Sequence, residues 1–401
     1  MTPDSRIREV CRRALRHATV ALAGAALVAA CGRAQPGGAA PLARAPIPAP
    51  DGRYGVGSIL LDVEDTRPAA ELPDGLVPTI EAQVWYPARG GNAGPFMPYF
   101  PRRIVLERMR AQGYFAQPPE RIAGWARLDV HATRNALPAV RAGGFPLVLF
   151  APAAGIPMEQ YAALLQELAS RGFVVVAVPP RAARASSFRR TAADVRAEDP
   201  DQRAADLSLV LRRFVSATGS VGAIAQRADL TRAGAFGHVA GGLVALRACA
   251  REAVLQRCAS LDGAPAQADF TRPLTRPFLA IASRPDSAAA QATVTAGQVD
   301  APARWLDLFV ASDGAPGALY ALDGASTMTF TDAPFVMPAI TGALGQRGDP
   351  AALQRLTVDA LAAFFGVRDG APLDPVDALD TARPELERVR QAARADVDPL
   401  R

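Results

Sequence analysis

The sequence predicts an α/β fold with a mostly parallel central sheet and helices on both faces. Short continuous apolar runs bounded by Gly and Pro, such as residues 146–150 and 173–178, are typical of strands buried on both faces. These runs alternate with amphipathic helical patterns, such as residues 158–170. Strand–helix alternation of this kind indicates a parallel sheet covered on both sides.

The elements are expected in the following order. Alternating apolar residues predict strands at 58–63 and 79–86, and residues 102–112 have the pattern of a short helix. The strands at 146–150 and 173–178 and the helix at 158–170 come next. After them we expect a helix at 201–215, a strand ending at 236 and a helix from 242. Further strands are expected at 258–261, 277–282, 305–310 and 318–322, followed by a closing helix at 349–365. Residues 369–401 are predicted to form a loose tail with one short helix at 384–393.

Length and composition fit one large domain behind a targeting segment. The chain has 401 residues, of which 50% are hydrophobic and 21% charged, close to globular averages. The formal net charge is +5, but residues 1–30 contain five Arg against Asp4 and Glu9, so subtracting their +3 leaves +2 for the rest. This balance excludes nucleic acid as an expected partner.

Residues 1–30 are predicted to be an export signal. Five arginines precede an apolar run at 18–30 that is too short to span a bilayer as a stable helix. The run ends Leu27-Val28-Ala29-Ala30-Cys31, which resembles the lipobox of bacterial lipoproteins. The resemblance implies cleavage before Cys31, acylation of that residue and attachment to a lipid bilayer in the cell envelope. Because Gly32 does not match the usual inner-membrane retention signal, an outer membrane is the expected location if the cell has one. An ordinary signal with an incidental cysteine is the alternative.

Residues 31–53 are rich in Ala, Pro and Gly and are expected to form a tether, with the folded domain at 54–368. Of the four cysteines, Cys11 leaves with the signal and Cys31 is the lipidation site, which leaves Cys249 and Cys258. Nine residues across a helix-to-strand connection can bring these two sulfurs together, so a disulfide is predicted, with two buried thiols as the alternative. No residue pattern predicts a metal site or an organic cofactor.

The most informative motif is a nucleophile elbow without its nucleophile. In the G-x-S-x-G pattern a strand turns sharply into a helix and exposes a serine on the turn. Gly237, His238 and Gly241 match that pattern here, but the serine position holds Val239. Valine has no nucleophilic atom, so the usual esterase mechanism cannot start from it.

Several stretches together resemble the bacterial relatives of the plasma-type platelet-activating factor acetylhydrolases, a branch of the α/β-hydrolase fold. The matching stretches lie between residues 54 and 365 and include Trp85-Tyr86-Pro87, residues 144–150, 161–178 and 203–207, and Leu261-Asp262-Gly263. The resemblance implies hydrolysis of short acyl esters by a Ser-Asp-His triad without metal or organic cofactor.

The resemblance also assigns the site positions. The nucleophile position is Val239, the acid position is Asp262, and the histidine position in the Gly324–Phe330 segment holds Thr327. The oxyanion loop contains Pro152 and Ala153. Since proline has no backbone N–H, an oxyanion donor is expected to be missing there. We therefore expect a degenerate triad.

No other residue is a clear substitute. His238 is expected to be a packed structural residue and His131 a surface or strand-end residue, while Ser186, Ser187 and Ser326 are expected to be solvated loop hydroxyls. Losing the serine or the histidine of a triad costs on the order of a million-fold in turnover.

Three hypotheses follow for the function. The first is an inactive hydrolase that binds a lipid, an ester-like ligand or a partner protein without cleaving it. The second is an active carboxylesterase with a displaced nucleophile and base, and the third is a structural envelope protein. Because a β-branched residue strongly disfavours the positive φ of an elbow, the turn at Val239 is also predicted to have relaxed.

Overall fold

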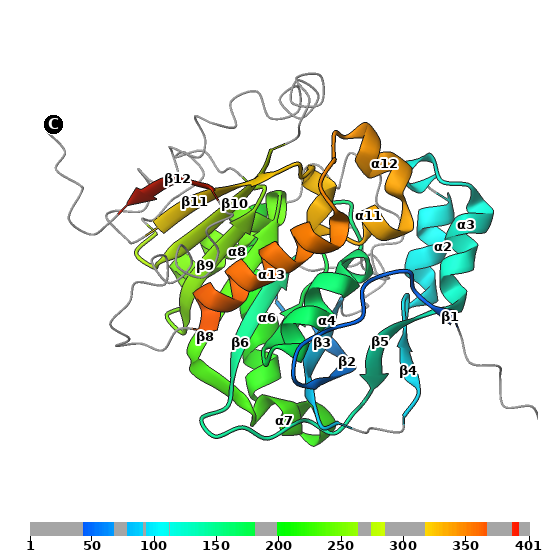
Figure 1. The fold of residues 1–401 in the computed structure, drawn as a ribbon. Helices are drawn as coiled ribbons and strands as arrows, with labels where there is room; N and C mark the ends of the chain where they lie inside the picture. Colours follow the sequence, from blue (N-terminus) through cyan, green and yellow to red (C-terminus); the bar gives the residue numbers. More distant parts are fainter. Residues whose placement is uncertain are drawn as a thin grey trace, which may run out of the picture. The chain divides into compact units, whose positions relative to one another are not determined.

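The computed structural model describes residues 43–67, 78–90, 94–111, 113–180, 199–263, 274–284, 317–366 and 387–392. Twelve strands of these residues form one sheet in the order β1-β5-β2-β3-β7-β6-β8-β9-β10-β11-β12, with β4 paired to β5 (Figure 1). The strands are β1 (Ala43–Arg44), β2 (Gly55–Glu64), β3 (Thr79–Ala88), β4 (Phe96–Pro98), β5 (Leu128–Arg134), β6 (Phe145–Ala151), β7 (Val174–Ala177), β8 (Ala228–His238), β9 (Leu255–Leu261), β10 (Phe278–Arg284), β11 (Gly317–Asp323) and β12 (Glu387–Ala392).

The strands from β7 through β6, β8, β9 and β10 to β11 are all parallel, while β3 pairs with both of its neighbours antiparallel. The continuous apolar runs therefore became the central parallel strands, as predicted. Their successive side chains enter opposite faces of the sheet: Leu147 and Leu149 of β6 lie in one core cluster, and Val148 and Phe150 lie in the other.

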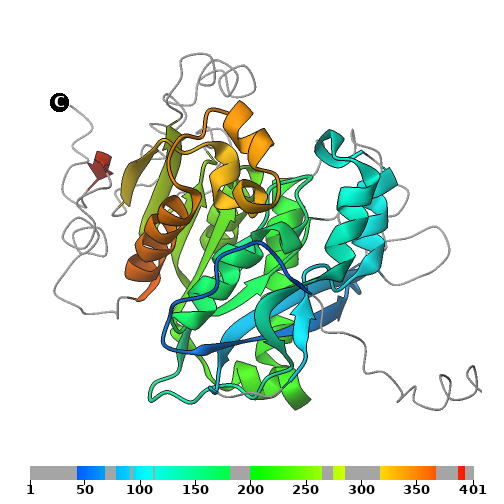
Figure 2. The same cartoon turned by 45° about the vertical axis from the view of Figure 1, so that its right-hand side comes forward.

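Helices cover both faces of this sheet. The α-helices are α2 (Arg103–Ala111), α3 (Pro119–Gly124), α4 (Ala162–Ser170), α6 (Pro200–Val215), α7 (Gly219–Ala225), α8 (Ala240–Arg251), α11 (Ala333–Val336), α12 (Pro338–Ala343) and α13 (Pro350–Gly366). Helices α4 and α13 pack on one face with the short α11, whereas α6, α7 and α8 pack on the other (Figures 1 and 2). The prediction of an α/β fold with two helical layers is confirmed.

Some predicted elements were wrong. The helix expected at 384–393 is not formed; β12 (Glu387–Ala392) pairs antiparallel with β11 instead, so part of the predicted loose tail is ordered. The unpaired backbone edge of β11 supplies hydrogen-bond partners that outweigh the helical preference of that segment. The helix expected at 158–170 begins with a 3₁₀ turn, η4 (Met158–Tyr161). The strand expected at 305–310 lies outside the described residues.

The folded unit begins at Ala43, eleven residues before the predicted domain start at Tyr54. We call residues 45–53 the strap. The strap runs from β1 across α4: Ala45 and Ile47 are buried, the Ile47 carbonyl accepts from His131 Nε2 at 3.2 Å, and the Gln166 side chain donates to the Pro48 carbonyl. The segment predicted to be a tether is therefore partly docked, because its apolar residues find a surface to cover.

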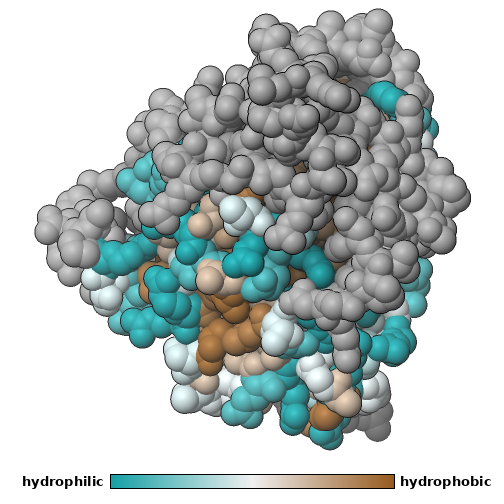
Figure 3. Space-filling view, turned by 90° about the vertical axis from the view of Figure 1, so that its left-hand side faces the viewer, coloured by the Kyte–Doolittle hydropathy of each residue, from teal (hydrophilic) through white to brown (hydrophobic). Residues whose placement is uncertain are grey.

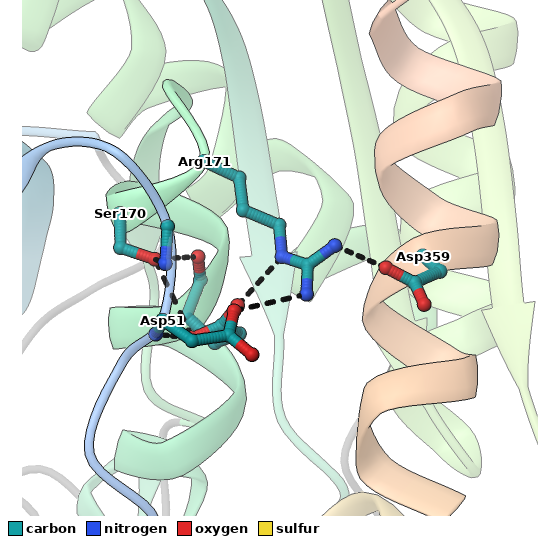
Figure 4. A network of polar contacts seen from close by, with 6 residues as sticks. Asp51, Ser170, Arg171 and Asp359 are labelled. Atoms are coloured by element: carbon teal, nitrogen blue, oxygen red, sulfur yellow. Dashed lines mark hydrogen bonds and ion pairs between the residues drawn. The ribbon is translucent and has the colours of Figure 1, made fainter. Parts of the chain in front are cut away.

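Arg171 holds the end of the strap in place (Figure 4). Its guanidinium pairs with Asp51 at 3.2 Å, with Glu167 at 2.6 Å and with Asp359 of α13. The amide of Asp51 also donates to the Glu167 carboxylate at 2.9 Å, and the amide of Gly52 donates to Ser170 Oγ. These contacts connect the strap, α4 and α13.

Cys249 of α8 and Cys258 of β9 form the predicted disulfide, and both residues are buried. Closing a loop of about ten residues in the unfolded chain corresponds to about 3 kcal/mol of stability. We expect reduction with a thiol to lower the free energy of unfolding by about 2–3 kcal/mol, measured by urea unfolding with and without reductant. The expectation would be contradicted if the reduced protein, with its thiols shown to be free, had the same urea midpoint as the oxidised protein.

No single helix in the described ranges is long and apolar enough to cross a bilayer, and α6 with α7 passes by length and composition only as a pair bent by 99°. On the face shown in Figure 3, a small apolar patch lies among hydrophilic residues.

Candidate functional site

The elbow is fully formed at the end of β8. Val239 has φ 51° and ψ −121°, and α8 begins at the next residue. The prediction that this turn has relaxed is therefore wrong. The Val239 amide donates to the Leu261 carbonyl of β9 at 2.9 Å, and the Val239 carbonyl accepts from Gly242 at 2.8 Å. Both peptide groups of the turn are thus held by neighbouring backbone.

Close backbone packing explains why the strain persists. A Cβ on Gly237 would lie 1.9 Å from the Gly241 carbonyl oxygen, and a Cβ on Gly241 would lie 2.0 Å from the Ala151 carbonyl oxygen. The strand end, the helix start and the β6 loop therefore meet without side chains between them. Holding a valine at positive φ costs on the order of 1–3 kcal/mol, which the surrounding contacts outweigh.

The acid position and the histidine position lie side by side. Asp262 follows β9, is buried, and accepts hydrogen bonds from the amide of Ser283 at 3.1 Å and from its hydroxyl at 2.9 Å. The Thr327 side chain, at the start of η8 (Thr327–Phe330), hydrogen-bonds to the same carboxylate. Burial raises the pKa of Asp262, and the bonds from Thr327 and Ser283 oppose that rise. The acid is therefore held toward the residue that replaces its expected histidine partner.

The oxyanion loop has no free donor at the expected positions. Pro152 has no N–H, and its carbonyl accepts from the Arg203 guanidinium at 2.8 Å. The amide of the next residue, Ala153, donates to the Tyr161 hydroxyl at 3.1 Å and is buried. An oxyanion at this site would have to displace Tyr161 to reach that amide.

Tyr161 also contacts His238. The Tyr161 hydroxyl lies 2.9 Å from His238 Nδ1, and the imidazole is fully buried. Burial lowers the pKa of His238 to about 4, although the backbone of Thr327 acts to raise it. His238 is therefore neutral at physiological pH and connects η4 to the elbow. The sequence offered no signal for this role of Tyr161 beyond its place in the 161–178 stretch.

A second buried polar group lies at the start of α4. Asp332 accepts from the amides of Ala162 and Ala163 at 3.0 and 2.9 Å and from the Tyr99 hydroxyl at 3.0 Å. It caps α4 from a segment 170 residues away. Sequence reasoning missed Asp332, because nothing near it in the chain identifies the helix that it caps.

Glu159 of η4 is buried beside this cluster, and its Oε1 has no hydrogen-bond partner among the described residues. Burial raises the pKa of Glu159 to about 7; Arg102 opposes the rise and Glu81 adds to it. Burial likewise raises the pKa of Asp332 to about 7.

This raised pKa predicts a pH dependence of stability. The Glu159 carboxyl titrates near 4.5 in the unfolded chain and near 7 in the folded one. Between these values only the unfolded chain loses the proton, so the free energy of unfolding falls as pH rises toward 7 and is then constant. We expect Glu159→Gln to raise the free energy of unfolding by on the order of 2 kcal/mol above pH 7 and to change it little near pH 4. Urea unfolding across this range tests the prediction, and an equal effect at both ends would contradict it.

Ser186 and Ser187 lie outside the described residues. Ser326 is buried at the start of η8 and takes part in its capping box with Thr329, so it is not a solvated hydroxyl as predicted. His131 is half-buried on β5 and contacts the strap, and burial lowers its pKa. Among the described residues, neither Ser326 nor His131 forms a hydrogen bond with the elbow.

No protein-family model and no curated protein sequence matches the chain. Among solved structures it is similar to a ferulic acid esterase from Streptomyces cinnamoneus, with a TM-score of 0.64 and 25% sequence identity over 86% of this chain and 99% of that chain. With the mostly parallel sheet and the elbow, this likeness shows an α/β-hydrolase fold of the esterase type.

Proposed function

We propose that this α/β-hydrolase-fold protein binds a lipid or another ester-like ligand without hydrolysing it. The observation that carries the proposal is Val239, which occupies the elbow in the backbone conformation of a nucleophile and has no atom that can attack a carbonyl. The strained turn and the orientation of Asp262 have both persisted beside it. An intact elbow and a positioned acid without a nucleophile are consistent with binding of a ligand, but not with its hydrolysis by the usual triad mechanism.

The alternative, an active esterase with a displaced nucleophile, has weaker support from the described residues near the elbow. Three serines lie there, and each hydroxyl is engaged: Ser260 donates to the Gly263 carbonyl, Ser283 donates to Asp262, and Ser326 contacts Gln346. None of them has a histidine within hydrogen-bonding distance among those contacts.

The proposed class of ligand is argued from the similarity of this chain to known proteins. The esterase neighbour supports a site shaped for a carboxylic ester. The resemblance to platelet-activating factor acetylhydrolases narrows this proposal to an ester that is part of a lipid. The lipobox at 27–31 supports a mature protein anchored through acylated Cys31 in the cell envelope.

Two measurements on the purified natural protein test the proposal. We expect no turnover of short-chain p-nitrophenyl esters above buffer and no labelling by a fluorophosphonate probe, together with an increased Tm in the presence of short-chain phospholipid. Saturable turnover with a label mapped to one serine would establish the displaced-nucleophile esterase instead. Absence of both turnover and ligand-induced stabilisation would favour a structural envelope protein.

A further inference from the structure

The place where the tether joins the folded unit is fixed. Ala43 of β1 is paired with Leu128 of β5, and Arg44 with Asp129. Arg44 also donates to the Val130 carbonyl and stacks on the Phe96 ring at 3.1 Å. Leu128 directly follows η3 (Trp125–Arg127), so β1 lies beside the end of α3 and the turn that follows it (Figure 1).

Eleven residues lie between Cys31 and Ala43. A chain of this length spans at most about 40 Å, whatever its conformation. If Cys31 carries lipid, as proposed above, the surface around β1 is held close to the bilayer at a high effective concentration.

The surface at that place is basic and has two exposed aromatic rings. We define the tether-side face by six exposed residues: Arg44, Phe96, Arg110, Phe115, Arg121 and Arg127. Residues 102–127 contain six Arg and two Glu, a net +4, whereas residues 31–401 together carry only +2. Arg102 is paired with Asp62 and Glu81, so the exposed charges of this segment are four Arg against two Glu, a net +2 (Arg103, Arg110, Arg121 and Arg127; Glu107 and Glu120).

Phe115 is presented by a strained turn. Helix α2 is followed by Gly113 at φ 64°, and in η2 (Tyr114–Ala116) Phe115 and Ala116 have φ 46° and 52°. Phe115 is 42% exposed and Phe96 is 38% exposed. Left-handed backbone at two non-glycine residues is unfavourable by itself, and the Phe115 ring packs edge-on against Tyr114 with the ring centroids 4.6 Å apart.

Arg110 of α2 and Arg127 of η3 line one surface hollow of about 370 Å³, together with Glu120 and three small or cyclic residues of α3. Two guanidinium groups beside a hollow are suited to the phosphate of a lipid headgroup. Aromatic rings among arginines at a surface are typical of segments that lie in a membrane interface.

We propose that the tether-side face docks on the anionic surface of the bilayer that holds the lipid on Cys31. The arginines bind lipid phosphates, and Phe115 and Phe96 enter the headgroup region. The same turn carries Tyr114, which packs against the core cluster on the α4 face of the sheet. This inference rests on the proposed anchor at Cys31 and does not require that a ligand binds.

The test uses the lipidated mature protein in vesicles of phosphatidylcholine with phosphatidylglycerol. Because Cys31 is acylated and Cys249 is bonded to Cys258, a new cysteine at Phe115→Cys can be labelled selectively with an environment-sensitive fluorophore. Val215→Cys at the end of α6, which is 45% exposed, is the matched control. We expect quenching by nitroxide-bearing lipid at position 115 and not at 215, and loss of that quenching in vesicles of phosphatidylcholine alone or in high salt.

The variant Arg110→Glu/Arg121→Glu/Arg127→Glu is expected to reduce the ratio of docked to undocked protein by on the order of 100-fold, roughly five-fold for each arginine. The control variant Arg212→Glu/Arg213→Glu/Arg251→Glu, made on other exposed arginines, should leave quenching unchanged. Protein that stays attached by its lipid with both probes unquenched overturns the docking alone. Protein that stays off the vesicles altogether overturns the lipid anchor and the docking together.

Discussion

The double variant Val239→Ser/Thr327→His is expected to hydrolyse short-chain p-nitrophenyl esters at least ~100-fold faster than the natural protein. Loss of a triad serine or histidine costs on the order of a million-fold, and the elbow and the acid residue are in place. The turn already has the backbone conformation of a nucleophile, and Asp262 already hydrogen-bonds to residue 327. Steady-state turnover of both proteins measures the effect, with each single variant as a control.

Full activity is not expected from these two changes, because the Ala153 amide donates to the Tyr161 hydroxyl. Adding Tyr161→Phe frees that amide, and one oxyanion donor contributes about 10²–10³ in turnover. We therefore expect the triple variant to be at least ~10-fold faster than the double variant, and Tyr161→Phe alone to remain inactive. If the double variant folds and stays inactive, the assignment of Val239, Asp262 and Thr327 as a former triad is wrong.

Asp332→Ala is expected to lower the free energy of unfolding by about 4 kcal/mol. The change removes the acceptor of three hydrogen bonds, from Tyr99 and from the amides of Ala162 and Ala163, and leaves those donors buried. Each buried donor left without a partner costs about 1–3 kcal/mol. Urea unfolding measures the loss.

Asp349→Ala is the matched control. Asp349 also receives a bond from a helix amide, that of Ala352 at 2.8 Å, but it lies at the surface. Its removal should cost only about 1 kcal/mol, since water replaces the lost acceptor. Equal losses in the two variants would contradict the role assigned to the buried carboxylate.

The central sheet could be predicted because strands buried on both faces must be apolar along their whole length, as in β6 and β7. Elements stabilised mainly by distant partners could not be predicted. Strand β12 forms because β11 offers an open edge, and the strap docks because Glu167 and Arg171 at the end of α4 bind Asp51. Such partners are far away in the chain, and local patterns do not identify them.

In the candidate site, too, local features could be predicted from the sequence and contacts between distant residues could not. The elbow glycines and the substitution at Val239 are local features, and the motif identified their positions. The conformation of Val239 was predicted incorrectly, because the penalty of positive φ was weighed without the contacts of Gly237 and Gly241. The contact of Tyr161 with Ala153 and His238 depends on how α4 sits against the sheet, which only the folded chain determines.

The ion pairs of Arg171 have a consequence for the order in which the chain folds. Arg171 lies 120 residues from Asp51 and 188 residues from Asp359. As the chain is made from its N-terminus, the strap cannot complete these contacts until nearly all of the polypeptide has emerged. Closing loops of this length also delays docking relative to local helix formation. The complete set of contacts that holds the strap therefore forms late in folding.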